Sequence, residues 1–383
     1  MPERRARRVA FLTPADANVV GAWSGIPYHS LRALRGVYPD IRFFPCPLSH
    51  NVRRLLQRAA VPFGLDISRE PLVSGLFAAE LRGRLRRYDP DLVIGVSAAV
   101  QLCRRLVDAP VINVTDAVYA GLVDYYPPTG SGIHPRSRRL GNLQEMAALE
   151  NSDAVVLSSR WAADSARRYY GVPADRLHVV PFGANLMPAA DPVTDRQTDI
   201  CRLLFVGVDW QRKGGPLVQQ VADLLLRRGI KVELHIVGCN PTIDGPHIVR
   251  HGFLRKDDPA DHQRLMRLFN DSSFFFMPSR REAFGIVYAE ASAFGLPSVA
   301  TATGGVPCAV RHGVNGLLLP EAAGAEAYAD AIAEHWGDAE RYRLLQRQSV
   351  LLSRDTLNWS AWATRVAEIG DSLAGRRIVG IPN

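Results

Sequence analysis

The sequence predicts an α/β protein with two open parallel sheets, each covered by helices, in two domains that face each other across a cleft. Two observations support this prediction. The chain has 383 residues, enough for two domains that each bury a core. Short apolar runs alternate with longer amphipathic stretches in both halves, as in parallel βαβ units. Ligands of such sheets bind beyond the carboxyl ends of the strands.

The first half, residues 1–186, is predicted to form one domain. Its apolar runs predict strands over residues 9–14, 92–97, 111–116, 154–159 and 177–183. Amphipathic stretches between them predict helices over residues 30–37, 75–88 and 160–171. A polar, proline-containing stretch over residues 187–199 then predicts a linker.

The second series begins after this linker and predicts a second domain over residues 200–355. Its strands are expected over residues 202–209, 232–238, 273–279, 297–305 and 316–320. The alternation with helical stretches matches that of the first half. Both domains are therefore expected to have doubly wound parallel sheets.

The net charge of +8 reflects arginine, because lysine occurs only at Lys213, Lys231 and Lys256. The arginines are dispersed and do not form a stripe with aromatic residues, so we expect no nucleic-acid partner. Five scattered cysteines without C-x-x-C spacing indicate reduced thiols and no metal site. The N-terminal apolar run is too short for a signal peptide, and a cytoplasmic location is expected.

A basic loop follows the first strand of the second domain. Arg212 and Lys213 precede two glycines where a strand leads into a helix. Cationic side chains, exposed amides and the positive end of a helix all favour an anion such as a phosphate. The alternative is a solvated basic turn, but a lysine stands out where arginine is the default.

The stretch from Ser279 to Gly305 contains two glutamates, Glu282 and Glu290, separated by seven residues. We expect Glu282 in the loop before a helix and Glu290 about one and a half turns into it. The backbone N–H groups of Phe284, Gly285 and Ile286 are expected to point into the same space. Carboxylates beside free amides suit sugar hydroxyls, which both donate and accept hydrogen bonds. The alternatives are charge complementarity at the helix end for Glu282 and an ordinary surface residue for Glu290.

These motifs, in this order, resemble the retaining glycosyltransferases of family 4, which have the GT-B architecture. In the second half the likeness includes "RKGG", the E-x7-E pair, "GLPSVATATGG" and "HGVNGLLLP". In the first half it includes "YDPDLVIG", "LENSDAVVLSS" and "VVPFGAN". Near the end "LNWSAWATRVAEI" resembles a helix that crosses back onto the first domain, which is expected over residues 356–383.

The resemblance implies a role for each of these residues. Glu282 would hold hydroxyls of the transferred sugar, and Glu290 would hold the ribose hydroxyls of the nucleotide. Lys213 would bind the diphosphate, and Gly25, in the loop after the first strand, would approach it from the first domain. Backbone contacts to sugar and diphosphate would come from Phe284, Gly285 and Ile286.

Three positions depart from the family pattern. Val208 stands where many relatives have an arginine, and we expect Arg212 to supply that charge. Asp116 ends a strand where relatives often have a histidine, so we expect it to orient the donor sugar or the acceptor; the alternative is an aspartate that caps the next turn. Cys308 stands where relatives often have a glutamate, and nothing in the sequence explains the change.

The resemblance implies transfer of a hexose-type sugar from a nucleotide-diphosphate sugar to an acceptor hydroxyl, with retention and without metal or cofactor. A UDP-sugar is the first expectation for the donor and a GDP-sugar the second. The acceptor is a glycan, a lipid-linked sugar or a secondary metabolite, in a pocket near Trp23, Tyr28 and residues 124–140. Asp116, Lys213 and Glu282 are the expected catalytic residues.

Other functions stay open on the same fold. They are a nucleotide-sugar epimerase, a phosphorylase and a non-catalytic sugar-binding protein. The basic amphipathic stretches over residues 51–61 and 80–88 are compatible with peripheral contact at the inner face of a membrane, or with ordinary helices that cover a sheet. The oligomeric state is open too.

Overall fold

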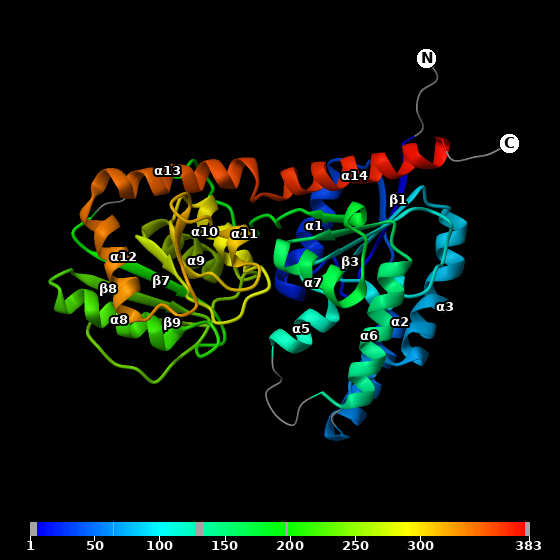
Figure 1. Cartoon of the computed structure of the whole chain (residues 1–383), viewed down its shortest axis with the longest axis horizontal. Helices are drawn as coiled ribbons and strands as arrows, with labels where there is room; N and C mark the ends of the chain where they lie inside the picture. Colours follow the sequence, from blue (N-terminus) through cyan, green and yellow to red (C-terminus); the bar gives the residue numbers. More distant parts are fainter. Residues whose placement is uncertain (1–5, 64, 127–132, 193, 196–197, 380–383) are drawn as a thin grey trace, which may run out of the picture. The chain divides into compact units, whose positions relative to one another are not determined.

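The computed structural model describes residues 6–63, 65–126, 133–192, 194–195 and 198–379, and side chains up to residue 373. The chain divides into two compact units (Figure 1). The first contains Met1–Val180 and Trp362–Asn383, and the second contains Pro181–Ala361. This boundary precedes the end that we predicted for the first domain, and the predicted linker falls in the second unit, with residues 193, 196 and 197 outside the described part.

The first unit is built on a six-stranded, all-parallel sheet with the order β2-β1-β3-β4-β5-β6. Its strands are β1 (Arg8–Leu12), β2 (Asp40–Phe43), β3 (Leu92–Val96), β4 (Val111–Thr115), β5 (Ala154–Leu157) and β6 (Leu177–Val179). The five predicted strands are confirmed. The sequence analysis missed β2, an edge strand of four residues in which only Ile41 is buried.

Helices and 3-10 turns cover this sheet. They are η1 (Ala22–Gly25), α1 (Ile26–Arg35), α2 (Pro47–Ala60), η2 (Val61–Phe63), η3 (Ile67–Arg69), α3 (Pro71–Tyr88), α4 (Ala99–Leu102), α5 (Tyr119–Tyr125), α6 (Pro135–Glu150), α7 (Arg160–Tyr170), η4 (Ala174–Arg176) and the C-terminal α14 (Trp359–Val379). Arg7 Nη1 forms an ion pair of 2.7 Å with Asp371 Oδ1, which ties α14 to the start of the first unit. The three predicted helices are confirmed.

The second unit contains another six-stranded parallel sheet, with the order β12-β11-β10-β7-β8-β9. Its strands are β7 (Cys201–Val206), β8 (Val232–Val237), β9 (Ile248–Gly252), β10 (Phe274–Phe276), β11 (Ser298–Thr301) and β12 (Gly316–Leu319). The sequence analysis missed the edge strand β9, which carries the polar residues Arg250 and His251. Its helices are α8 (Gly215–Arg227), α9 (Pro259–Asp271), α10 (Ile286–Ala293), α11 (Val306–Ala309), α12 (Ala325–Gly337) and α13 (Ala339–Asp355).

The strand orders show where each sheet offers a binding site. In the first sheet the chain leaves β1 toward β2 on one side and resumes at β3 on the other. In the second sheet β7 and β10 have the same relationship. Loops that leave neighbouring strands in opposite directions open a crevice at the carboxyl end of the sheet. Among the described residues, no helix combines the length and the apolarity needed to cross a bilayer.

Candidate functional site

The loop between β7 and α8 forms a tight basic turn. The Arg212 N–H donates to Asp209 Oδ1 at 3.0 Å, and Gly214, the residue before α8, has φ of +82°. A Cβ on Gly214 would lie 2.1 Å from the carbonyl oxygen of Pro278, which follows β10. Only glycine allows this approach, since a side chain would collide with backbone and the positive φ is unfavourable for it. The basic loop is thereby held against the loop that carries the first glutamate.

Arg212, Lys213 and Glu282 lie together between these two loops. Lys213 Nζ forms an ion pair with Glu282 Oε2, and Arg212 Nη1 lies 3.9 Å from the same oxygen. Arg212 also donates to the carbonyl oxygen of Arg281 at 3.1 Å, and its own carbonyl oxygen accepts from the N–H of Arg280 at 3.0 Å. Glu282 is nearly buried. The structure thus joins three predicted site residues at the switch point of the second sheet.

The first turn of α10 contains the predicted backbone group. Gly285 precedes the helix with φ of +79°, Phe284 is buried, and Ile286 is the first helical residue. The Tyr288 hydroxyl donates to the Met277 carbonyl oxygen at 2.6 Å and so fixes α10 to the strand end. Helix N-termini present N–H groups without an intrahelical partner, which favour an anion.

Glu290 forms a second ion pair, which the sequence analysis missed. It lies on α10 with 1% of its surface exposed, and Lys256 Nζ approaches its Oε1 at 2.6 Å. Lys256 comes from the segment between β9 and α9. A carboxylate this deeply buried requires a partner to remain charged. Lysine is rare in this chain, and the signal that singled out Lys213 could also have singled out Lys256.

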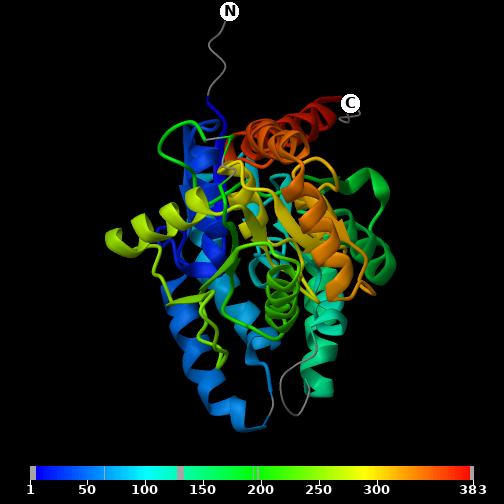
Figure 2. The same ribbon diagram turned by 90° about the vertical axis from the view of Figure 1, so that its left-hand side faces the viewer.

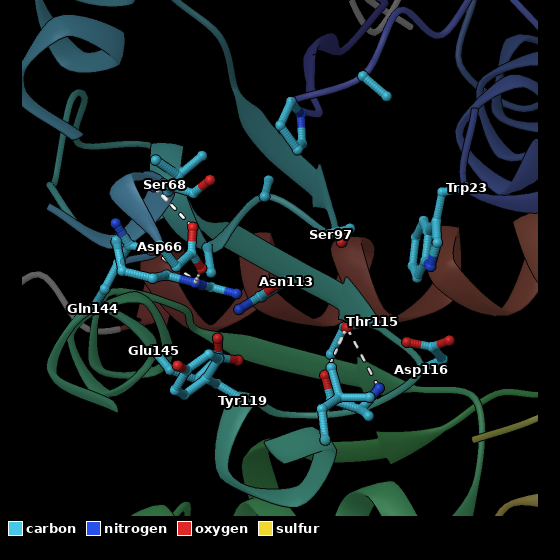
Figure 3. A pocket seen from close by; sticks show the side chains of 18 of the residues that line it. Trp23, Asp66, Ser68, Ser97, Asn113, Thr115, Asp116, Tyr119, Gln144 and Glu145 are labelled. Carbon is cyan, nitrogen blue, oxygen red and sulfur yellow. Dashed lines mark hydrogen bonds and ion pairs between the residues drawn. The ribbon is translucent and has the colours of Figure 1, made fainter. Parts of the chain in front are cut away.

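A pocket of about 380 Å³ lies at the carboxyl ends of β1, β3 and β4 in the first unit. Figure 3 shows Trp23 and Asp116 at one end, and Asp66, Gln144 and Glu145 at the other. Next to Asp116, the Thr115 hydroxyl donates to the Ala117 carbonyl oxygen at 2.9 Å and shapes the turn. Trp23 and Asp116 were expected near a ligand, and both line this pocket. Tyr28 is not among its lining residues, and residues 127–132 of the predicted acceptor loop lie outside the described part.

The far end of the pocket has charged residues that the sequence analysis missed. Arg69 Nη1 donates to Gln144 Oε1 at 3.1 Å, and the Arg69 guanidinium lies 4.5 Å from the ring centre of Tyr119. Glu145 is buried, and this burial raises its pKa to about 7, although Arg69 and a Tyr119 backbone hydrogen bond favour the ionised form. Glu145 shares helical spacing with the buried Gly141, a signal that could have located it.

Comparison with known proteins assigns the family. The model of glycosyltransferase family 4 matches residues 28–187, and the model of the group 1 glycosyl transferases matches residues 201–338. The chain belongs to glycosyltransferase family 4. Together the two matches cover most of both units of this family 4 protein.

Curated relatives and solved structures agree with this assignment. The D-inositol 3-phosphate glycosyltransferase of Xylanimonas cellulosilytica is 30% identical over 267 residues, which are 65% of this chain and 63% of the relative. The corresponding protein of Corynebacterium glutamicum is 25% identical over 260 residues, 62% of this chain and 61% of that one. The matches thus span less than two thirds of these relatives.

A Rickettsia africae glycosyltransferase has a TM-score of 0.65 at 14% identity, over 96% of this chain and 99% of that chain. The structure of Anabaena HepE with UDP and glucose has a TM-score of 0.61 at 16% identity, over 96% of this chain and 100% of that chain. These neighbours show a GT-B fold.

The remaining predicted residues of this family 4 protein lie as follows. Gly25, at the start of α1, has φ of +82° and follows two residues that are also left-handed, Trp23 at +43° and Ser24 at +55°. Non-glycine residues in this region are strained, and such strain concentrates at functional sites. Gly25 and Asp116 belong to the first unit, and the other predicted site residues belong to the second. Nothing in the structure explains the change to Cys308.

A histidine pair lies near the carboxyl end of β8 and β9. His235 Nδ1 is 3.0 Å from His251 Nε2, and the two rings stack with centroids 5.2 Å apart. Burial lowers the pKa of both histidines, to about 4 for His251. The register between β8 and β9 shifts at this point. The segment over residues 251–258, where we expected the nucleotide base to be recognised, therefore begins at a neutral, irregular strand end.

Proposed function

We propose that this protein transfers a hexose-type sugar from a nucleotide-diphosphate sugar to an acceptor hydroxyl, with retention of the anomeric configuration. The observation that carries the proposal is the cluster of Arg212, Lys213 and Glu282 at the switch point of the second sheet. It combines two cations for a diphosphate with one carboxylate for sugar hydroxyls. Membership of family 4 supports the same reaction.

In this mechanism the bond between the anomeric carbon and the β-phosphate oxygen breaks, and the electron pair leaves with the phosphate. The acceptor oxygen bonds to the anomeric carbon from the same face, and its proton passes to the leaving phosphate. Negative charge grows on the diphosphate, so cations fixed in advance lower the barrier. Arg212 and Lys213 would supply them, and Glu282, released from Lys213 by the phosphate, would accept hydrogen bonds from the sugar.

Glu290 would hold the ribose, with Lys256 orienting its carboxylate. A UDP-sugar is the first candidate donor, supported by the UDP and glucose named in the Anabaena HepE structure, and a GDP-sugar is the second. We propose that no metal takes part. Arg212 and Lys213 would already supply the cations that the leaving diphosphate needs. The reaction is therefore expected to proceed in EDTA.

The pocket of the first unit is the candidate acceptor site. Asp116 would orient the reacting hydroxyl, and Arg69, Gln144 and Glu145 would bind hydroxyls at the other end. Mixed donors and acceptors suit a molecule with several hydroxyl groups. The named substrate of the curated relatives, D-inositol 3-phosphate, is a molecule of this kind, and we propose a polyol or sugar acceptor here.

The first test is the thermal shift of the purified protein with UDP, GDP, ADP and TDP, each with and without EDTA. A ligand that binds only the folded state raises the melting temperature. We expect one nucleotide diphosphate to stabilise the wild type equally in both conditions, and Lys213→Met to lose most of that shift. Lys231→Met, which removes a lysine just before β8, is the matched control and should keep it. No stabilisation by any nucleotide, or an equal shift in Lys213→Met, would overturn the donor site.

A further inference from the structure

Helix α2 packs with its polar side toward the rest of the first unit. The Ser49 hydroxyl donates to Glu80 Oε2 at 2.6 Å, and Arg53 Nη1 donates to Ser68 Oγ at 3.0 Å. Gln57 donates to the carbonyl oxygen of Leu65 at 2.9 Å and accepts from the N–H of Ile67 at 2.8 Å. The inner face of a surface helix is usually apolar. In α2 the polar side chains of Ser49, Arg53 and Gln57 lie inside and hold the helix through hydrogen bonds.

Three large apolar side chains of α2 face solvent instead. Leu48 is 72% exposed, Val52 41% and Leu55 69%. These positions are four and three residues apart, so they form one line along the helix. The next turn, η2, adds two exposed apolar side chains, Val61 at 62% and Phe63 at 73%. We call these five residues the α2 stripe. Figure 2 shows α2 as the blue helix at the lower left, at the margin of the first unit.

The neighbouring helix α3 has the opposite arrangement over residues 77–87. Phe77, Leu81 and Leu85 of α3 are fully buried, and Arg86 and Arg87 face solvent. The basic stretch over residues 80–88 is thus an ordinary helix with a solvated charged face. Of the two stretches that the sequence analysis left open for membrane contact, only the one over residues 51–61 presents apolar side chains outward.

The charged residues within the segment that carries the stripe have one sign. Residues 47–63 contain three arginines and no carboxylate. Arg54 and Arg58 are exposed and flank the stripe on one side, as their helical spacing from Leu55 requires. Apolar side chains beside cations on an interfacial helix match a bilayer with anionic headgroups, because the former enter the acyl boundary and the latter meet phosphate. We propose that α2 and η2 dock this protein on an anionic lipid surface.

A lipid surface fits better than a second copy of the chain. Two stripes packed together would bring the arginines of both copies close, with no carboxylate in residues 47–63 to pair with them. Five side chains also offer a smaller apolar face than the roughly 800 Å² per partner of a stable protein interface. Anionic headgroups would neutralise the arginines.

Docking through α2 would also determine how far the pocket of the first unit lies from the membrane. His50 and Arg53 of α2 line that pocket from the helix side opposite the stripe. A membrane on the outer side of α2 would therefore lie one helix diameter from the pocket, on the order of 10 Å. Lipid docking does not depend on the proposed function, because the stripe contains none of the residues assigned to the reaction.

Flotation of the full chain with vesicles tests this inference. The vesicles are phosphatidylcholine alone, or phosphatidylcholine with phosphatidylglycerol, at low and high salt. We expect the protein to float with the anionic vesicles at low salt, and at least tenfold less with the neutral ones. Leu48→Gln/Leu55→Gln should lose most of this binding, and Arg54→Gln/Arg58→Gln should lose its salt-sensitive part.

The chain offers matched controls for both variants. Leu344→Gln/Leu351→Gln removes two leucines of α13 that are 52% and 47% exposed, and Arg86→Gln/Arg87→Gln removes two exposed arginines of α3. Both should float like the wild type. Failure of the wild type to float, or equal loss in the controls, would overturn the proposal. A wild-type dimer that becomes a monomer in Leu48→Gln/Leu55→Gln, as measured by light scattering, would overturn it in favour of self-association.

Discussion

Lys256 Nζ lies 2.6 Å from Glu290 Oε1, and the other glutamate of the E-x7-E pair, Glu282, forms its ion pair with Lys213. Two of the three lysines in the chain therefore neutralise the two glutamates. The carboxylates are held in place by these lysines before any ligand arrives. A donor would then have to replace these lysine–glutamate contacts with contacts of its own. This favours ligands that offer phosphates to the lysines and hydroxyls to the glutamates.

Breaking the Lys256 pair should destabilise the second unit. Lys256→Met leaves a buried carboxylate without its cation, and we expect a loss of about 2 kcal/mol in the free energy of unfolding. Glu290→Gln/Lys256→Met should be more stable than the sum of the single changes predicts, because the second change removes the stranded charge. Urea unfolding of the four proteins measures this coupling. Additive effects would show that the pair does not stabilise the fold.

Because the pKa of Glu145 is raised in the folded state, the free energy of unfolding should fall as the pH rises. Its folded pKa of about 7 lies above the unfolded value of 4.5, so its contribution is complete below pH 4.5 and is lost by about pH 7. The difference corresponds to about 3 kcal/mol. Glu145→Gln should therefore gain stability relative to the wild type between pH 5 and pH 8. Glu150→Gln, an exposed change on the same helix, should run parallel to the wild type in melting curves across this range.

His251 should act in the opposite direction. Its folded pKa of about 4 lies below the unfolded value of 6.5, so its contribution is present above pH 6.5 and is lost as the pH falls toward 4. His251→Gln should therefore weaken the acid destabilisation between pH 6.5 and pH 4. His262→Gln on α9 is the comparison. Equal acid sensitivity of all three proteins by circular dichroism would contradict this assignment.

Replacing Gly214 by alanine should cost more stability than its positive φ alone explains, because the added Cβ would collide with neighbouring backbone. Gly214 and Gly229 both have φ of +82°, but a Cβ on Gly229 would meet nothing within 4 Å. Gly229→Ala should cost about 1 kcal/mol, the effect of the angle. Gly214→Ala should cost at least 1 kcal/mol more and should also weaken nucleotide binding, because the Pro278 carbonyl must move. Calorimetry with the nucleotide that stabilises the wild type compares the two.

Arg212 should supply the charge that relatives carry at the position of Val208. Val208 is 66% exposed, and Arg212 lies beside Glu282. Arg212→Gln should lower kcat/KM by about 10²-fold, since one fixed charge at a developing anion contributes on this scale. Arg227→Gln, in the last turn of α8, should leave the rate unchanged. Unchanged kcat/KM in Arg212→Gln would assign the charge to another residue.

Ten strands were predictable because their apolar runs stand out from polar surroundings, and the loops at their carboxyl ends contain most of the predicted site. The two missed strands, β2 and β9, lie at sheet edges, where burial on one face leaves no continuous apolar run. The Lys256 pair was missed because it joins residues distant in sequence. Glu145 was missed because its helix was not predicted, and periodicity alone did not show that the apolar side of α2 faces solvent.

The neighbouring positions of β7 and β10 have a consequence for folding. Phe274 of β10 pairs with Leu203 of β7, although β8, β9 and α9 lie between them in the chain. Lys213 and Glu282 follow these two strands, so they can meet only after a long loop has closed. A nascent chain that ends before β10 would contain the basic loop without its glutamate. We therefore expect nucleotide binding to appear late in refolding, once the second sheet is complete.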